Sequence, residues 1–350
     1  MIPQLIERLI SGERADPGAL EDALHRIMQG EVREAQVAGL LVALRAREPD
    51  AATLAACARA LRAHRRAVHP HVRPLADTCG TGGDRTGTFN ISTAAALVVA
   101  AAGGAVAKHG NRSVSSKAGS ADVLEAAGCA LELDPERACR LLDATGFVFL
   151  FAPVFHPAMA HVAPVRRALG IRTLFNLLGP LANPALAERQ LLGVYDAGMT
   201  RVVAEALLEL GTQRALVVHC AGLDEIGLHA VTQGHQVRDG RVEPFTLDPQ
   251  ALGLAPAPLE ALRGGDAAEN ARILLATLGG DRGPRSDVVA LNAAAALEVA
   301  GLARDLGEGL TQARDILANG AAARVLARYA ESSQRAAVPG PAPLVRELGR

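Results

Sequence analysis

Apolar, strand-like runs alternate with helical patterns after about residue 74, and this alternation leaves few folds open to the chain. The strand-like runs lie near 75–79, 104–110, 147–153, 189–196 and 214–220. Helical patterns separate them and also cover 200–211 and most of 266–331. This order predicts an α/β fold with a mostly parallel central sheet and helices on its faces. Asp239-Gly240 predicts one hairpin, because Asp-Gly suits a type I′ turn.

Residues 1 to about 68 show helical periodicity without a strand pattern. Four segments, separated by Gly12, Gly30 and the Glu-Pro-Asp before Ala51, place apolar residues three and four positions apart. We expect four amphipathic helices that form a small N-terminal helical domain. Helical patterning returns between Met159 and Pro184 and ends in Gly-Pro and Asn-Pro. We expect this second stretch to pack on the first.

These patterns divide the chain into two domains and a tail. The helical domain covers 1–70 and is completed by about 160–188. The larger α/β domain covers 74–158 and 189–335. The connections between the domains are expected to act as a hinge, with the active site in the cleft. Residues 336–350 are Pro-rich and are expected to form a loosely held tail.

The composition is that of a globular protein and excludes several classes of partner. Lys and Arg number 36 against 37 Asp and Glu, and they are not clustered, which disfavours nucleic acid as the main partner. The five cysteines show no CxxC spacing, which indicates reduced thiols in a cytoplasmic protein without a structural zinc site. The longest apolar run, Ala94 to Ala107, is too short to cross a bilayer, and the N-terminus is charged early. We therefore expect neither a membrane partner nor a secretory signal.

The stretch DTCGTGGDRTGTFNIST, residues 77–93, is expected to be a loop between a strand ending near Cys79 and a helix beginning near Ser92 or Thr93. Its glycines let the backbone approach a ligand and turn N–H groups inward, and Ser92 or Thr93 is expected to cap a helix whose N-terminus attracts anions. Phosphate is the natural ligand. The stretch is neither a Walker A loop nor a dinucleotide motif, since no Gly-Lys-Ser/Thr follows and Arg85 replaces the third glycine. A flexible turn with an ordinary helix cap is the alternative.

A second polar loop follows the next expected strand. Lys108, His109, Asn111 and Arg112 precede a Ser/Gly-rich loop with Ser115, Ser116, Lys117, Gly119 and Ser120, which leads into a helix with Asp122 in its first turn. Cations and backbone donors at this position predict another anion site facing the same crevice. A solvated surface is the alternative.

Asp224 and Glu225 follow the apolar strand LVVHC and place two carboxylates near a strand end. Magnesium takes one or two carboxylates and completes its octahedron with water and phosphate oxygens. Together with the two phosphate loops, the pair predicts a magnesium site. A solvated turn is the alternative for this pair taken alone.

The motifs DTCGTGGD, FNIST, KHGNR, GSADVLEAAG, FHPAM, VRRALGIRTLFNLLGPLANP and GLDEI occur in this order. They closely resemble the anthranilate phosphoribosyltransferase family over residues 1 to about 331. Members of this family join anthranilate to 5-phosphoribosyl-1-pyrophosphate (PRPP) in tryptophan biosynthesis, releasing pyrophosphate. The resemblance implies the nucleoside phosphorylase/phosphoribosyltransferase fold, two Mg²⁺ ions per active site and a homodimer formed through the helical domain. It also implies that no protein nucleophile is used.

The resemblance assigns three sets of residues. It implies that PRPP is held by Gly80, Thr81, Gly82, Gly83, Asp84, Thr88, Asn90, Ser92, Thr93, Lys108 and Ser120. It implies that anthranilate lies against Gly80, His109, Asn111, Pro153, Arg166 and Gly179. It implies that magnesium is bound, directly or through water, by Ser92, Asp224 and Glu225.

Arg166 is expected to bind the anthranilate carboxylate, although Arg167 competes for this assignment. On a helix the two side chains diverge by about 100°, so only one can face the cleft. Arg166 lies between Val162 and Leu169 at helical spacing, on the side that the apolar residues mark as buried. The helix phase therefore agrees with the resemblance.

Two other functions remain open at this point. Pyrimidine nucleoside phosphorylases share the overall fold and a Thr-Gly-Gly loop, but they would need a base-recognition pocket in place of Arg166 and Asn111. A catalytically silent homologue that binds nucleic acid would be expected to lose the Gly-Gly-Asp or Asp-Glu features. The more common phosphoribosyltransferase fold is excluded, because its acidic pair precedes a Thr/Gly-rich loop, whereas Ile226-Gly227 follows Asp224-Glu225 here.

Overall fold

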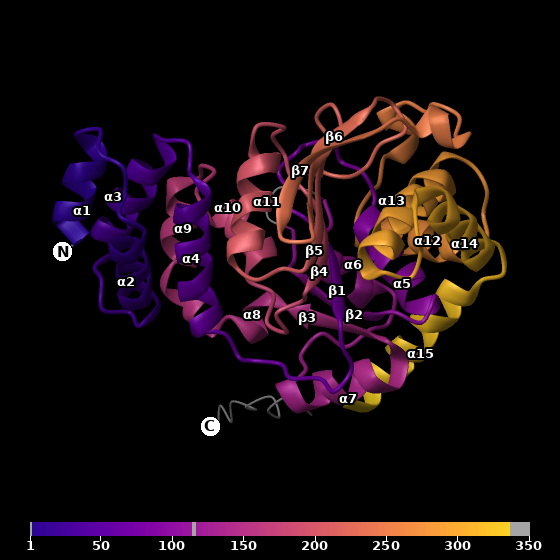
Figure 1. Ribbon diagram of the computed structural model, residues 1–350. Coiled ribbons are helices and arrows are strands. Elements are labelled where there is room, and N and C mark those ends of the chain that lie inside the picture. Colours follow the sequence, from indigo (N-terminus) through magenta and orange to yellow (C-terminus); the bar gives the residue numbers. More distant parts are fainter. Residues whose placement is uncertain (1, 114–116, 337–350) are drawn as a thin grey trace, which may run out of the picture.

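The computed structural model describes residues 2–113 and 117–336 (Figure 1). Ser115, Ser116 and all but the first residue of the expected tail lie outside these ranges. The N-terminal part forms the four expected helices α1 (Ile2–Ile10), α2 (Pro17–Met28), α3 (Glu34–Arg45) and α4 (Ala51–Ala63). Two of them begin at aspartate caps: Asp16 accepts a hydrogen bond from the Ala19 N–H and Asp50 accepts one from the Thr53 N–H.

The described residues form one seven-stranded sheet, in the order β3-β2-β1-β4-β5-β6-β7. Its strands are β1 (Leu75–Gly80), β2 (Ala105–Gly110), β3 (Phe147–Phe151), β4 (Arg189–Gly193), β5 (Arg214–His219), β6 (Thr232–Arg238) and β7 (Arg241–Leu247). The first five are parallel, while β6 and β7 are an antiparallel hairpin at one edge. Asp239 and Gly240 both have positive φ at its turn, as the type I′ prediction requires. The predicted α/β fold is confirmed.

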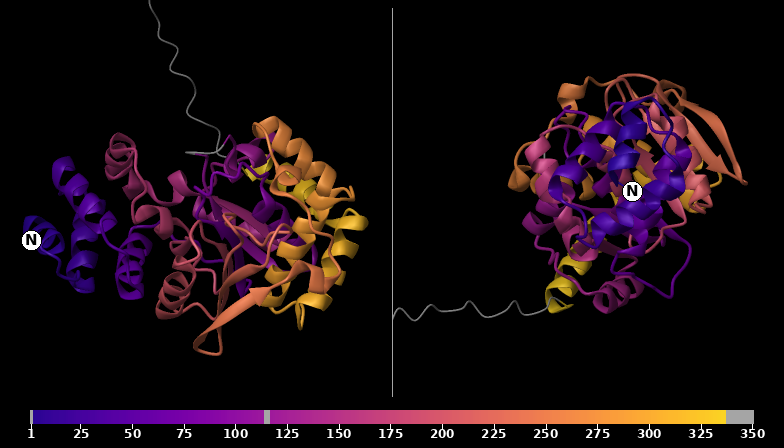
Figure 2. Two further views of the ribbon diagram at one scale, coloured as in Figure 1. Left: turned by 90° about the horizontal axis from the view of Figure 1, so that it is seen from above. Right: turned by 90° about the vertical axis from the view of Figure 1, so that its left-hand side faces the viewer.

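The remaining helices cover the two faces of the sheet and the ends of its strands. They are α5 (Ile91–Ala101), α6 (Ser120–Ala126), α7 (Pro135–Thr145), α8 (Ala152–Phe155), α9 (Ala163–Leu169), α10 (Phe175–Leu181), α11 (Met199–Glu209), α12 (Ala267–Leu278), α13 (Pro284–Ala300), α14 (Leu306–Ala318) and α15 (Ala321–Ala336). Short 3₁₀ helices occupy Pro157–His161, Pro249–Leu252 and Leu259–Leu262. Figures 1 and 2 show α1–α3 at one end of the molecule, away from α12–α14.

Alternate residues of the central strands belong to two different hydrophobic cores. Leu191 and Leu216 pack in the core that contains α5, α13 and α15. Their neighbours Leu192 and Val217 pack in the core that contains α1–α4 and α9–α11. This alternation is the period-two pattern of strands buried on both faces. The helical bundle is therefore continuous with one face of the sheet, and the segment after Met159 packs on it as expected. No helix in the described part of the chain has the length and apolar character needed to cross a membrane.

The end of α4 is tied to the segment that precedes β4 by bonds to backbone carbonyls. Arg62 Nε donates to Leu181 O at 2.8 Å, and Arg65 Nε donates to Pro184 O at 3.0 Å. Burial lowers the pKa of Arg62 to about 10. These bonds join the end of α4 to the Gly-Pro and Asn-Pro segment, which is one of the two connections expected to act as a hinge. The exact domain boundaries stay a prediction.

Tyr329 of α15 fixes the edge strand β3 and tests the packing of the C-terminal helix. Its buried hydroxyl accepts a hydrogen bond from the Phe149 N–H at 3.1 Å, and its ring meets Phe147 edge-on. Tyr329→Phe leaves this N–H buried and unpaired, so we expect a loss of about 1–3 kcal/mol in the free energy of unfolding. Chemical denaturation measures it. Tyr195→Phe is the matched control, because no hydrogen bond of that hydroxyl occurs within the described residues, and an equal loss there would contradict the interpretation.

His156, between α8 and the following 3₁₀ helix, predicts a loss of stability in acid. Its buried ring donates from Nε2 to Ala182 O at 2.9 Å, and burial lowers its pKa from 6.5 to about 4. As the pH falls from about 6.5 to about 4, His156 becomes protonated in the unfolded chain but stays neutral in the folded chain. The free energy of unfolding therefore decreases over this pH range. Between about pH 7 and about pH 5 this one group removes about 1–2 kcal/mol.

The test is His156→Gln, whose amide retains a donor for Ala182 O. The change in unfolding free energy between the two pH values should be smaller in the variant than in the wild type by about that amount. His71→Gln, at an exposed histidine, controls for the loss of an imidazole. An unchanged difference in His156→Gln would show that the buried ring does not titrate as described.

Candidate active site

The loops that carry most of the predicted site residues follow the carboxyl ends of the parallel strands. Strands β1, β2, β4 and β5 are parallel, and Gly80, Gly193 and Val218 are in register at or near their carboxyl ends. The loops that follow these strands therefore converge, which is where open α/β sheets bind ligands. Pro153, just after β3, lies at the same end of the sheet.

Two glycines allow the Asp224 turn to lie directly on the strand ends. A Cβ on Gly80 would lie 2.5 Å from Asp224 Oδ2, and a Cβ on Gly193 would collide with the Asp224 carbonyl oxygen. Strand β5 ends at His219, so Asp224 follows a turn closed by paired Cys220 and Leu223 backbones instead of directly continuing the strand. Larger residues in place of the glycines would displace this turn.

The glycine loop after β1 is anchored at successive residues. The Thr81 N–H donates to Gly193 O at 2.9 Å, and its hydroxyl accepts from the Tyr195 N–H at 3.1 Å. The Gly82 N–H donates to Asp224 Oδ2 at 2.7 Å. Gly82, Gly83 and Gly87 have positive φ, which explains the choice of glycine. The predicted loop is thus held against the predicted acidic pair.

The acidic pair is almost completely buried, at 8% exposure for Asp224 and 9% for Glu225. Burial, with Asp84 and Glu225 nearby, raises the pKa of Asp224 well above its ordinary value. Burial raises the pKa of Glu225 to about 7, opposed by the positive charge of Lys108. No ion pair neutralises either carboxylate within the described residues. The solvated-turn alternative is therefore wrong.

Ser92 links the pair to the second loop. Its N–H donates to Glu225 Oε1 at 3.1 Å, and its hydroxyl lies 3.4 Å from Lys108 Nζ. Lys108 is 2% exposed and also donates to Thr78 O. Helix α5 begins at Ile91, with Asn90 at the cap position and no side-chain cap bond. The expectation that Ser92 or Thr93 caps this helix is wrong, because both lie inside its first turn, where Glu225 accepts the Ser92 N–H.

Oxygen ligands and buried negative charge fit Mg²⁺. No group of three or more His, Cys, Asp or Glu residues that could hold a metal occurs in residues 2–113 and 117–336. A divalent ion held by Asp224 and Glu225 would therefore take the rest of its oxygens from ligand and water, as magnesium sites commonly do.

His109 is a neutral, buried histidine with one unused nitrogen. Its Nδ1 lies 3.2 Å from Gly179 O, and a carbonyl only accepts, so Nδ1 carries the proton. Burial lowers its pKa to about 3. Its Nε2 is buried and has no hydrogen-bond partner within the described residues. Nε2 therefore presents a free lone pair. His109 and Gly179, two of the residues expected to bind anthranilate, are in contact with each other.

The second loop has fewer groups available to bind an anion than the sequence predicted. Arg112 pairs with Asp122 at 2.9 Å and with Glu125 at 2.7 Å, so its charge is neutralised. Asp122 also accepts from the N–H groups of Ser113 and Gly119. Asp122 thus competes with any anion for these donors, and the prediction of Arg112 as an anion ligand is not supported. The side chain of Ser120 lies near Asn111 O, at 3.5 Å.

Arg166 and Arg167 differ as the helix phase predicts. Arg166 is half-buried on α9, its guanidinium lies 5.5 Å from the Phe175 ring centroid, and burial lowers its pKa. Arg167 is exposed. No hydrogen bond between described residues ties Arg166 to the glycine loop, so its role in the site stays a prediction.

Several polar residues of this region had no local signal in the sequence. Asn270 donates to Asn90 Oδ1 at 3.1 Å. Asp77 accepts from Asn183 Nδ2 at 2.8 Å and from the His109 N–H at 3.3 Å. Arg172, treated only as part of a family motif, donates to Gly83 O. Each contact joins positions more than 30 residues apart, which periodicity does not reveal.

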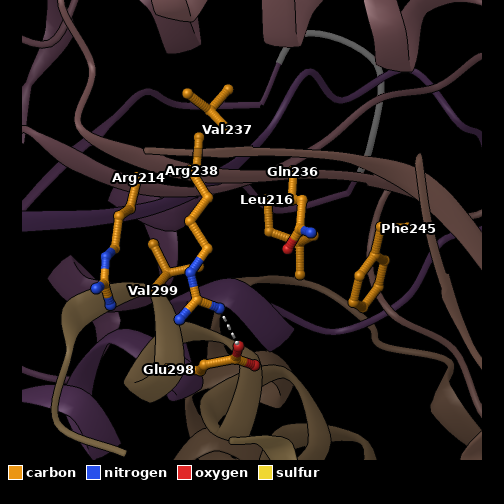
Figure 3. A pocket seen from close by; sticks show the side chains of 9 residues that line it. Arg214, Leu216, Gln236, Val237, Arg238, Phe245, Glu298 and Val299 are labelled. Atoms are coloured by element: carbon orange, nitrogen blue, oxygen red, sulfur yellow. Dashed lines mark ion pairs between the residues drawn. The ribbon is translucent and has the colours of Figure 1, made fainter. Parts of the chain in front are cut away.

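The small cavity in Figure 3, about 30 Å³, is a separate feature. It is lined in part by Arg214, the first residue of β5, and so lies at the opposite end of the strand from the Asp224 turn. Arg238 of β6 and Glu298 of α13 form an ion pair there at 3.6 Å. This pair joins the hairpin to α13.

Comparisons with known proteins match nearly the whole chain. The "Glycosyl transferase family, helical bundle domain" matches residues 3–65, and the "Glycosyl transferase family, a/b domain" matches residues 72–323. The anthranilate phosphoribosyltransferase of Symbiobacterium thermophilum is 50% identical over 333 residues, which cover 95% of this chain and 97% of the relative. That of Haloferax volcanii is 48% identical, covering 91% and 96%.

Solved structures agree. The anthranilate phosphoribosyltransferase of Thermus thermophilus superposes with a TM-score of 0.89 at 48% identity, covering 94% of this chain and 99% of that one. The Saccharomyces cerevisiae enzyme in complex with PRPP and Mg gives a TM-score of 0.86 at 29% identity, covering 95% and 98%. With its helical bundle, its α/β sheet and its buried acidic pair beside a glycine loop, the chain belongs to the anthranilate phosphoribosyltransferase family.

Proposed function

We propose that this chain transfers the 5-phosphoribosyl group of PRPP to the amine of anthranilate, giving N-(5-phosphoribosyl)anthranilate and pyrophosphate in tryptophan biosynthesis. The observation that carries the proposal is the joint anchoring of the glycine loop and Ser92 to the buried pair Asp224 and Glu225. A relative that is half identical over nearly the whole chain is an anthranilate phosphoribosyltransferase.

PRPP would occupy the edge where the glycine loop and the Lys108 loop meet. The backbone N–H groups of Gly83 and Asp84, which have no acceptor among the described residues, and the ammonium of Lys108 would bind its phosphate oxygens. Asn90, held by Asn270, would present its amide beside them. The other expected residues, assigned by the resemblance alone, are Thr88, Thr93 and Ser120.

Asp224, Glu225 and Ser92 would hold magnesium, for which we expect two ions per site. The yeast relative is in complex with PRPP and Mg. When bound, magnesium neutralises the charge that develops on departing pyrophosphate. The chain itself contributes the buried carboxylates, which are kept close to the loop by the Gly82 and Ser92 N–H groups.

Anthranilate would bind between the second loop and the segment before β4. His109 is suited to orient the amine, because its Nε2 lone pair can accept an amine N–H while Gly179 O holds the ring. Arg166 would bind the carboxylate, with Asn111 and Pro153 at the ring. A structure of the yeast relative is in complex with 4-fluoroanthranilate. The amine is largely neutral at pH 7, so positioning suffices and no protein nucleophile is needed.

Closure and assembly are further parts of the proposal. Movement at the hinge would bring the two substrates together and exclude water from the cationic ribose carbon. We propose a homodimer formed through the helical domain, where Ile10 and Val42 are exposed apolar side chains. A cytoplasmic location agrees with the five free cysteines.

An activity assay tests the function directly. Anthranilate fluorescence should fall only when the protein, PRPP and magnesium are all present, and pyrophosphate should appear in equal amount. Phosphorolysis of a pyrimidine nucleoside, or tight binding of nucleic acid without this reaction, would overturn the proposal and favour one of the alternatives.

Replacing the acidic pair should abolish the magnesium response. Asp224→Ala/Glu225→Ala should lower turnover by roughly a hundredfold or more, because stabilisation of the leaving group is lost. Folding should persist, since the change removes two buried charges. Asp281→Ala/Asp315→Ala removes two exposed carboxylates and is the control. A double mutant with unchanged magnesium dependence would refute the metal assignment.

Arg166 should determine affinity for anthranilate. A guanidinium can bind a carboxylate through two parallel hydrogen bonds, and a bond to a charged group contributes about 1.5–3 kcal/mol. Arg166→Ala should therefore raise the KM for anthranilate by roughly tenfold to a hundredfold and change the KM for PRPP much less. Steady-state kinetics measure both. Arg167→Ala is the matched control, and a larger anthranilate defect there would reverse the assignment.

A further inference from the structure

Arg172 contacts the glycine loop from a segment that does not belong to the sheet. It lies between α9 and α10, and its Nη2 donates to Gly83 O. A Cβ built on Gly83 would lie 3.4 Å from Arg172 Nε, so the guanidinium lies alongside the loop. Its carbon Cζ is 4.4 Å from the Tyr195 ring centroid, in a cation–π arrangement.

The backbone that carries Arg172 is fixed at both ends. Gly170, in the left-handed conformation, ends α9 and donates to Arg166 O. The side chain of Asn176 accepts from the Thr173 N–H at 2.9 Å at the beginning of α10. Arg172 therefore projects from a short connection that moves with α9 and α10, and stacking on Tyr195 further limits its rotamers.

Among the residues that the structure describes, no carboxylate pairs with the charge of Arg172. No ion pair to it occurs among residues 2–113 and 117–336, and it is half-buried. The neighbouring end of the site carries the carboxylates Asp84, Asp224 and Glu225. The Arg172 guanidinium donates to the neutral carbonyl of Gly83, although hydrogen bonds to charged groups are stronger. Arg172 therefore holds the glycine loop through this hydrogen bond and does not form a salt bridge with a described residue.

Three consecutive loop residues have three different anchors. Thr81 is held by Gly193 at the end of β4 and by Tyr195 just after it. Gly82 is held by Asp224, in the turn that lies against the ends of β1 and β4. Gly83 is held by Arg172, whose flanking residues Val165 and Phe175 pack in the core of the helical bundle. Arg172 thus links the α9–α10 segment directly to the glycine loop.

We propose that Arg172 is a positioning residue that couples α9–α10 to the PRPP loop, setting the loop N–H groups for the ligand. This inference rests on the proposed function for the identity of that ligand. Arg172 acts through Gly83, whereas Arg166 on the same segment is assigned to anthranilate. Loss of Arg172 should therefore weaken PRPP binding first.

The test compares Arg172→Ala and Arg172→Lys with Arg167→Ala, which removes an exposed cation from the same segment. Arg172→Ala should raise the KM for PRPP by about tenfold, the value of one charge-assisted hydrogen bond, and change the KM for anthranilate by less than about twofold. Arg172→Lys should restore part of the loss, because lysine retains one donor but cannot reproduce the planar stacking. Arg167→Ala should change neither constant.

Hydrogen exchange without substrates gives a second readout that does not depend on catalysis. The amides of 81–84 should exchange faster in Arg172→Ala than in wild type, while those of the central strands stay equally protected. An unchanged PRPP constant in a folded Arg172→Ala, a larger anthranilate defect, or unchanged exchange of the loop would overturn the proposal. If only the proposed function were wrong, the wild type would be inactive in the assay, but the amides of 81–84 would still exchange faster in Arg172→Ala.

Discussion

The contact between the Asp224 turn and the ends of β1 and β4 is the constraint on which the rest of the site depends. The Asp224 carboxylate can approach β1 only because Gly80 lacks a Cβ, and the Asp224 carbonyl can approach β4 only because Gly193 lacks one. The same approach lets Asp224 accept the Gly82 N–H, which places the glycine loop. The two glycine positions and the placing of the glycine loop therefore depend on one close packing arrangement.

This packing carries an electrostatic cost. Two carboxylates and Lys108 are nearly excluded from water, and burial raises the pKa of both acids. Isolated buried charges destabilise a fold, and among the described residues backbone N–H groups, the Ser92 hydroxyl and the Lys108 ammonium offset them. Active sites commonly hold such perturbed groups, because a bound ligand or ion supplies the missing counter-charge. The buried pair is therefore suited to receive a cation, as the proposed magnesium site requires.

The sequence predicted features that depend on local pattern. Alternating strands and helices, the Asp239-Gly240 turn and the phase of Arg166 against Arg167 all follow from short-range periodicity or backbone preference. It also located Asp224 and Glu225 correctly near a strand end, because apolar strands and polar loops alternate clearly there.

Non-local competition explains what the sequence did not predict. Ser92 looked like a helix cap, but Glu225, 133 residues away, takes its N–H. Arg112 looked like an anion ligand, but Asp122 and Glu125 neutralise it from the next helix. Nothing in the sequence around Arg172 indicated a partner, but in the fold its guanidinium donates to Gly83 O. In each case a donor or a charge found its partner through the tertiary structure, where spacing along the chain carries no signal.

Manganese binding followed by electron paramagnetic resonance tests the central claim that the buried pair receives a divalent ion together with the phosphorylated substrate. With PRPP present, the wild-type chain should give a spectrum distinct from that of the manganese–PRPP complex in solution. Asp224→Ala under the same conditions should give only the solution spectrum. Identical spectra from the wild type and the variant would contradict the account.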